Sequence, residues 1–165
     1  MTARRTGKPG SAGATGTIIS VNISRKKGRS KTAVPEAMII AGEGLRDDAH
    51  RAYGHRQVSL LMTESIEEQQ KKLGGGSGIS LGPGAFAENL TTRGIDLSRL
   101  TVGDELVVRG KDGAVRLKVS QIGKECHAGC AIFKLTGDCI MPELGIFCEV
   151  LRGGTVAVGD RIEKK

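Results

Sequence analysis

Short runs of valine, isoleucine and leucine, separated by glycines, are the feature that most limits how this chain can fold. In the segment from Thr17 to Ile23, the apolar residues Ile19, Val21 and Ile23 alternate with polar ones, as in a strand with one buried face. The chain also has 25 glycines, which supply the tight corners that many short strands require. This pattern predicts a mainly β protein.

Four further segments have the apolar pattern of strands. These segments are residues 36–42, 56–62, 106–119 and 145–151. The third of them has the pattern of a hairpin, with its turn at Lys111, Asp112 and Gly113.

Residues 63–73 are the one segment with a clear helical pattern. Ser65 and Glu68 match a capping box, and glutamates precede lysines by four residues along the segment. The glycine-rich residues 74–78 are expected to end the helix.

Two later segments, Leu100–Leu106 and Val156–Ile162, both fit the pattern V-G-D-x-[L/I]. In each, Gly-Asp favours a turn, and an apolar strand segment follows. Two matches are too few for a repeat protein, so we interpret them as recurring corners. Together, these segments predict about eight short strands and one helix. This predicts a β-barrel of short, mostly antiparallel strands, with one or a few helices and long inserted loops.

The positive charge of the chain is concentrated near its beginning. Residues 1–15 are polar and basic, and we expect a disordered tail there, followed by one barrel domain over residues 16–165. Residues 1–31 contain eight of the 25 basic side chains and no acidic one, which leaves 17 basic and 18 acidic side chains for the rest. Because this remainder is about neutral, we do not expect binding to nucleic acid.

No stretch of the sequence has the roughly 20 apolar residues that span a bilayer, and no apolar segment follows the first basic residues. We therefore expect a cytoplasmic protein without membrane contact. In a reducing compartment its four cysteines should be thiols, which makes disulfides the weakest interpretation of their clustering.

Three of the four cysteines lie within residues 123–139, and two interpretations of this segment remain open. In the first, Cys126, His127 and Cys130 form half of a zinc site. Either of the other two cysteines, Cys139 or Cys148, could complete it, although the chain has no second C-x-x-C at a usual spacing.

In the second interpretation, Cys126 is a single reactive thiol. Lys124 and His127 lie close to it in sequence, and nearby cations lower the pKa of a thiol and favour the nucleophilic thiolate. Cys148 lies within the apolar run of residues 145–151, which is typical of a buried core cysteine.

A second group of polar residues precedes the strand at 56–62. It contains Asp47, Asp48, His50, His55 and Arg56, and polar groups at a strand mouth often form a site. A solvated loop that hydrogen-bonds to itself is an equally good interpretation. The two histidines are five residues apart, which is not the spacing of a helical zinc pair.

Glu88 and Asn89 lie between the apolar residues Phe86 and Leu90. A half-buried carboxylate in such a place usually has a hydrogen-bonded role. From spacing alone we favour a structural role.

Taken in order, several of these motifs resemble the MOSC family, the domain named for the carboxyl-terminal part of molybdenum cofactor sulfurase. The motifs are GLRDDAH at 44–50, HRQVSLL at 55–61, GAFAENLTTRGIDL at 84–97, LTVGDEL at 100–106, Cys126, and GGTVAVGDRI at 153–162. The resemblance runs from about Gly16 to Ile162 and is to the short, stand-alone bacterial type.

The resemblance implies a β-barrel that binds molybdopterin or the molybdenum cofactor. It also implies that Cys126 carries sulfur as a persulfide. The residues at the family's cofactor-binding positions are Asp48, His50, His55, Arg56, Glu88 and Asn89. Relatives with an added amino-terminal barrel, similar to the mitochondrial amidoxime reducing component, reduce N-hydroxylated compounds.

The chain departs from the family at one position of this loop. Where the family has Gly-Asp-x-His, this chain has Asp47, Asp48, Ala49 and His50. Aspartate tolerates a positive φ better than most residues, so the fold should survive. If that glycine admits a phosphate, the extra negative charge weakens anion binding at this loop.

Three functions follow from the resemblance. The first is a sulfurtransferase-like protein in which Cys126 accepts sulfur from a partner cysteine desulfurase and serves the molybdenum cofactor or a molybdoenzyme. Any pyridoxal phosphate then belongs to the desulfurase. The second is a non-catalytic cofactor carrier. The third is a molybdenum-dependent reductase of N-hydroxylated compounds, in which Cys126 is a molybdenum ligand.

The basic segment from Arg25 to Lys31 is a further candidate for the pterin phosphate, together with Arg56. The simpler interpretation is a solvated loop that aids solubility. We include Lys31 among the expected cofactor-binding residues.

Overall fold

The computed structural model describes residues 13–27, 29–52, 54–74, 76, 78–125 and 140–165. Its strands are β1 (Thr15–Ile23), β2 (Thr32–Val34), β3 (Glu36–Ile40), β4 (Gly44–Leu45), β5 (Val58–Met62), β6 (Leu90–Arg93), β7 (Glu105–Gly110), β8 (Gly113–Ile122), β9 (Ile146–Arg152), β10 (Gly154–Ala157) and β11 (Arg161–Lys164). Its helices are α1 (Thr63–Leu73), the 3-10 helix η2 (Leu97–Arg99) and the short α3 (Met141–Leu144).

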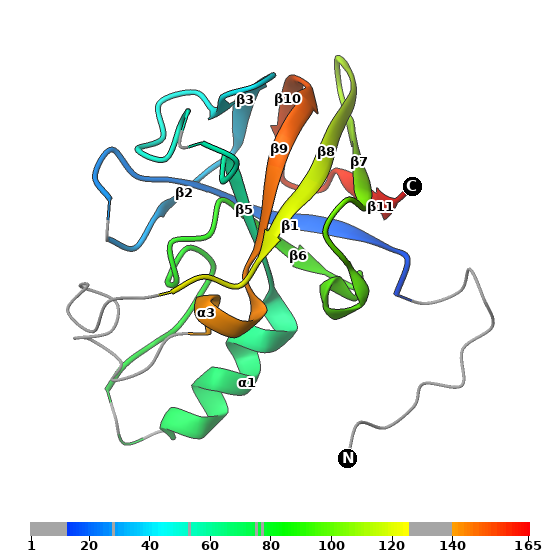
Figure 1. Ribbon diagram of the computed structural model, residues 1–165. Coiled ribbons are helices and arrows are strands. Elements are labelled where there is room, and N and C mark those ends of the chain that lie inside the picture. Colours follow the sequence, from blue (N-terminus) through cyan, green and yellow to red (C-terminus); the bar gives the residue numbers. More distant parts are fainter. Residues whose placement is uncertain (1–12, 28, 53, 75, 77, 126–139) are drawn as a thin grey trace.

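Seven strands close into a mixed barrel, which confirms the predicted fold class (Figure 1). The large sheet has the order β11-β7-β8-β9-β5-β6-β1-β2, and the pairing of β11 with β1 closes it. All its pairs are antiparallel except β5 with β6. A small sheet of β10, β3 and β4 packs beside the barrel. The described residues form eleven strands, more than the eight expected, because strands as short as β2, β4 and β6 show no apolar period.

The first strand is confirmed, but its buried face differs from the predicted alternation. Ile18, Val21 and Ile23 contact the core, while Ile19 is only half-buried. The pairing of β1 with β6 shifts register between Ile18 and Ser20. This bulge exchanges the two faces of the strand at that point.

The two V-G-D segments form matching corners, as predicted. The carboxylate of Asp104 accepts the N–H of Thr101 (2.9 Å), and that of Asp160 accepts the N–H of Ala157 (2.8 Å). Gly103 and Gly159 have φ values of 99° and 96°, which favour glycine at both turns.

The hairpin of β7 and β8 is also confirmed, because Gly110 pairs with Gly113 across a two-residue turn. The helix over residues 63–73 is confirmed too, but the predicted capping box is wrong. The helix starts at Thr63 directly after β5, so Ser65 lies inside it, and no side-chain hydrogen bond caps the start. Glu64 instead accepts the N–H of Gly94 (2.8 Å), which fastens the helix to the end of β6.

The main core fills the barrel, and a second apolar cluster lies outside it. This second cluster joins Leu61, Ile66, Phe86, Met141 and Phe147, which come from β5, α1, the loop before β6, α3 and β9. It holds α1 and α3 against the barrel wall. In the part of the chain that the structure describes, neither helix is long and apolar enough to cross a membrane.

Candidate functional site

Three loops meet on one side of the barrel (Figure 1). They connect β1 to β2, β4 to β5, and α1 to β6. The backbone N–H of Ser24 donates to Asp48 (3.0 Å), and the N–H of Lys31 donates to the carbonyl of Gly84 (2.8 Å). Residues 123–125, which follow β8, lie on the same side. Side chains far apart in sequence are therefore brought together there.

Lys31, Asp48 and His50 form a buried cluster within these loops. The Lys31 ammonium donates to Asp48 Oδ1 at 2.7 Å and to His50 Nδ1 at 3.1 Å. The side chains of Lys31 and Asp48 are each only 1% exposed. The structure thus brings three of the predicted cofactor-binding residues into contact.

The surroundings of Asp48 favour its carboxylate form. Burial alone would raise its pKa, but the hydrogen bond and charge of Lys31 and the N–H groups of Ser24 and His50 hold the pKa below its ordinary value. Burial lowers the pKa of Lys31, and its contact with Asp48 opposes that effect. Lys31 donates to both Asp48 and His50, and its contact with Asp48 favours the ammonium form.

His50 is neutral near pH 7. Burial lowers its pKa to about 4, aided by the positive charges of Lys31, Lys124 and Lys27 and opposed by Asp48. Because Lys31 can only donate, His50 Nδ1 must accept, and the ring proton lies on Nε2. The cluster therefore presents a neutral imidazole among cations.

Lys124 and Lys27 extend this positive region around His50. Lys124 also lowers the pKa of Lys31, so its charge acts on two members of the cluster. Such a group of cations around a neutral hydrogen-bond donor suits an anionic group such as a phosphate.

Lys124 lies two residues before Cys126 in the sequence. Cys126, His127, Cys130 and Cys139 lie outside the described residues, so both the reactive thiol and the zinc site stay predictions. The described residues contain no group of three or more His, Cys, Asp and Glu side chains that could hold a metal ion.

Cys148 lies inside the barrel core, as expected. It is 0% exposed, and burial raises the pKa of its thiol far above the ordinary value. Such a thiol is a poor zinc ligand, because zinc binds the thiolate.

Asp47 has a φ of 70°, in the left-handed region that favours glycine. This is the conformation that the family's glycine would adopt with least strain, and aspartate is one of the residues that tolerate it. The side chain of Asp47 is exposed, next to the buried Asp48.

Glu88 and Asn89 lie beside the cluster and hold the backbone around it. Glu88 is 0% exposed and accepts from the N–H groups of Gly84 and Phe86 and from the Thr91 hydroxyl. Burial raises the pKa of Glu88, and these hydrogen bonds oppose the change. Since Gly84 in turn accepts the N–H of Lys31, Glu88 supports the position of Lys31 through the loop.

Asn89 links three segments of the barrel. Its side-chain oxygen accepts from the N–H and hydroxyl of Ser59, and its amide donates to the carbonyl of Asn22. The side chain of Asn22 donates to the Glu88 carbonyl and to Thr91. These contacts match the structural role that we favoured from spacing.

His55 and Arg56 contact residues of β8 and β9. The exposed His55 ring contacts Gln121 (Nε2 to Oε1, 2.6 Å), and Gln121 donates to the carbonyl of Gly123 (2.7 Å). His55 therefore ties the loop before β5 to the end of β8, just before Lys124. The guanidinium carbon of Arg56 lies 5.8 Å from the ring centre of Phe147, within the range of a cation–π contact.

Sequence reasoning missed Asn22 and Gln121. Asn22 is buried in β1, and Gln121 lies in β8 beside a register shift. No local pattern distinguishes a polar strand residue that faces solvent from one that supports a site.

The fold and the site define a class of protein: a small closed β-barrel of seven strands, whose loops bury a lysine–aspartate pair and gather cations around a neutral histidine. The sequence profile of the MOSC domain matches residues 47–163, and the chain therefore belongs to the MOSC domain family. This family is generally linked to molybdenum cofactor binding.

Several solved structures share the fold. YuaD from Bacillus subtilis has a TM-score of 0.70 and 20% identity, and the match covers 91% of this chain and 95% of that one. YiiM from Escherichia coli has a TM-score of 0.65 and 19% identity, with 91% and 69% covered. YiiM from Geobacillus stearothermophilus has the same score and identity, with 91% and 75% covered. No curated protein matches this sequence.

Proposed function

We propose that this protein binds a molybdopterin-type cofactor and handles sulfur through Cys126, for sulfuration or delivery of that cofactor. The observation that carries this proposal is the buried pair of Lys31 and Asp48, with neutral His50 and Lys124 beside it. Lys124 belongs to this positive region and lies two residues before Cys126 in the sequence.

The described residues fit the phosphate of a pterin cofactor. Lys27 and Lys124 would attract the phosphate, and His50, with its proton on Nε2, can donate a hydrogen bond. Asp48 would keep Lys31 oriented rather than bind the anion itself. When bound, the cofactor would supply the molybdenum centre that receives or uses sulfur.

The sulfur step requires no external oxidant. The thiolate of Cys126 attacks the terminal sulfur of the desulfurase persulfide, the S–S bond of the donor breaks, and the donor leaves as a thiolate. The product is a persulfide on Cys126. The desulfurase, with its own pyridoxal phosphate, has already converted cysteine to alanine to form the donor.

Mass spectrometry of the protein after incubation with a cysteine desulfurase and cysteine tests whether Cys126 carries sulfur. We expect one added sulfur on Cys126 and none in Cys126→Ser. Added sulfur only on another cysteine, or none at all, would exclude this role. If Cys126→Ser still delivers a fully active cofactor, the protein binds and delivers the cofactor but does not transfer sulfur to it.

Binding of molybdopterin tests the anion site separately. Lys27→Gln with Lys124→Gln should weaken binding by about 5- to 25-fold and flatten its dependence on salt. The matched control, Lys71→Gln with Lys72→Gln, removes the same amount of charge from helix α1. It should change the affinity for molybdopterin by less than about twofold. Stoichiometric molybdenum in the anaerobically purified protein would favour the reductase function instead.

A further inference from the structure

The outer face of strands β11, β7 and β8 carries an excess of positive charge that the sequence count does not show. Side chains of a barrel strand alternate between the core and the outside. The outward charged side chains here are Glu105, Arg109, Arg116, Lys118, Arg161, Glu163 and Lys165. Five of these are cations and two are carboxylates, although the chain beyond residue 31 is about neutral.

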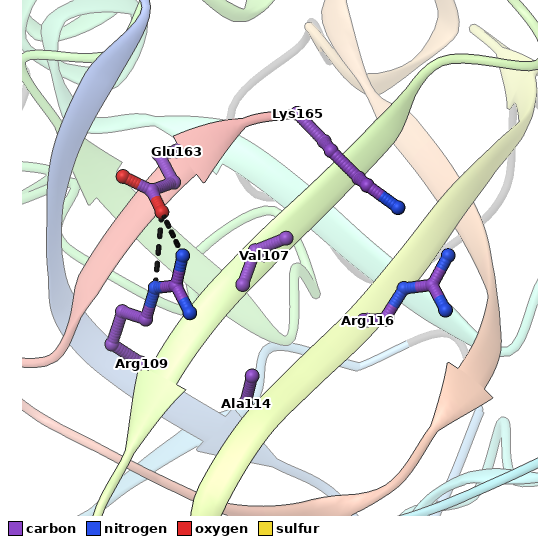
Figure 2. A pocket seen from close by; sticks show the side chains of 6 residues that line it. All are labelled: Val107, Arg109, Ala114, Arg116, Glu163 and Lys165. Carbon is purple, nitrogen blue, oxygen red and sulfur yellow. Dashed lines mark hydrogen bonds and ion pairs between the residues drawn. The ribbon is translucent and has the colours of Figure 1, made fainter.

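A shallow, open pocket of about 270 Å³ lies on this face (Figure 2). Val107 and Ala114 lie between the charged side chains that line it, and these are Arg109, Arg116, Glu163 and Lys165. Val107 is only 7% exposed, because the long side chains around it cover it.

Each of the two carboxylates on this face is shared by two cations. Glu163 contacts Arg109 at 2.6 Å and Arg161 at 3.5 Å. Glu105 contacts Arg116 at 2.6 Å and Lys165 at 3.5 Å. The end of the pocket formed by Arg116 and Lys165 therefore carries one positive charge that Glu105 does not balance.

Arg116 also has an unused donor. Its Nε atom is buried and has no hydrogen-bond partner within the described part of the chain. A buried donor without an acceptor is unfavourable and rare in folded proteins. A carboxylate seated between Arg116 and Lys165 would balance the charge, and it would satisfy this donor if the Arg116 side chain turns outward on binding.

We propose that this face binds an acidic segment of a partner protein and seats one of its carboxylates in the pocket. In an extended segment, side chains on one side repeat about every 7 Å, so several carboxylates can meet successive cations across the three strands. An open depression suits such a segment better than a small ligand, whose sites bury most of its surface.

Two other occupants suit the face less well. A single-stranded nucleic acid uses exposed aromatic rings, but Phe86 and Phe147, the aromatic residues that the structure describes, are buried. The beginning of the chain carries Arg4, Arg5 and Lys8 and no acidic residue within residues 1–12, so its charge does not match this face either.

Titration of the ¹⁵N-labelled full chain with a hexaglutamate peptide at low ionic strength tests the proposal. We expect amide shifts to concentrate in residues 105–109, 114–118 and 161–165. Arg116→Gln with Lys165→Gln should weaken binding by about 5- to 30-fold. The matched control, Lys71→Gln with Lys72→Gln, removes two charges from helix α1 and should change affinity by less than about twofold.

Shifts confined to residues 24–31, or an equal loss of affinity in the control, would overturn the proposal. So would binding of glutarate as tightly as the peptide, since this would indicate a site for a small dicarboxylate. Tighter binding of oligothymidylate at the same amides would indicate a nucleic-acid surface and would also overturn it. Because the shift map uses the unmodified chain, the test does not depend on the folding of a variant.

Discussion

The buried pair of Lys31 and Asp48 allows the sharpest test of the site. In Asp48→Asn, the amide keeps the shape of the carboxylate but leaves the Lys31 ammonium without a negative partner. Removal of one member of a buried ion pair costs about 3–5 kcal/mol of unfolding free energy, and both side chains here are only 1% exposed. Because the amide oxygen can still accept from Lys31, we expect the lower end, about 3 kcal/mol.

This loss should depend on pH in a definite direction. Without Asp48, the pKa of Lys31 in the folded protein lies further below its value of 10.5 in the unfolded chain. The unfolded chain then binds more protons, so the stability of Asp48→Asn rises as pH rises toward 10.5. The difference from the unmodified protein should therefore be larger at pH 7 than at pH 9.5.

Urea unfolding at both pH values measures this difference. For a domain of this size, a loss of about 3 kcal/mol corresponds to a fall in melting temperature of roughly 6–12 °C. The double variant Lys31→Met with Asp48→Asn removes the unpaired charge and should recover part of the loss. A loss below about 1 kcal/mol at pH 7, or one that grows with pH, would refute the buried ion pair.

Three further variants or measurements test single features. Asp47→Gly should change the free energy of unfolding by less than about 1 kcal/mol, because relief of the left-handed strain is offset by the freedom of glycine in the unfolded chain. Asp47→Val should instead lower it by about 1–2 kcal/mol, as measured by urea unfolding. Gly84→Ala should cost about 2–5 kcal/mol, since its φ is +88° and a Cβ would lie 2.3 Å from the Lys31 carbonyl; an unchanged midpoint would contradict this geometry. Limited alkylation of the native protein should label Cys126 first and Cys148 only on unfolding, because Cys148 is fully buried; labelling of Cys148 first would contradict this order.

The elements that the sequence predicted are those with a local signal. The helix from Thr63 to Leu73, the hairpin of β7 and β8 and the two V-G-D corners each depend on residues a few positions apart. The capping box was wrong because the start of the helix is set by the preceding strand and not by its own first turn. The bulge of β1 depends on pairing with β6, which no local pattern shows.

The sequence named Lys31, Asp48 and His50 as candidates, but it could not show that they lie in contact. Lys31 belongs to a basic loop that looks solvated in sequence, yet it is buried, because Asp48 and Gly84 from two other loops meet it. The charged outer face of β11, β7 and β8 could not be seen either, because a net charge counts residues and not the sides of strands on which they lie.

His50 provides a separate test of the positive region. Its pKa in the folded protein is about 4, below the ordinary value of 6.5, so the unfolded chain binds more protons between these two values. Stability is then fully present above about pH 6.5 and is lost as pH falls toward 4, by up to about 3 kcal/mol. His50→Asn keeps an acceptor at the position of Nδ1 for Lys31 but cannot titrate, so the pH dependence of urea unfolding in this range should become smaller.

An NMR titration of His50 separates the effect of burial on its pKa from the effect of the nearby charges. Lys124→Gln removes one of the cations that hold the pKa of His50 down, so this pKa should rise in the variant. Lys71→Gln, on the exposed side of α1, is the control and should leave the titration unchanged. If His50 titrates near 6.5 in the unmodified protein, or if Lys124→Gln leaves it unmoved, Lys124 does not act on the cluster, and the link between this site and the segment of Cys126 loses its support.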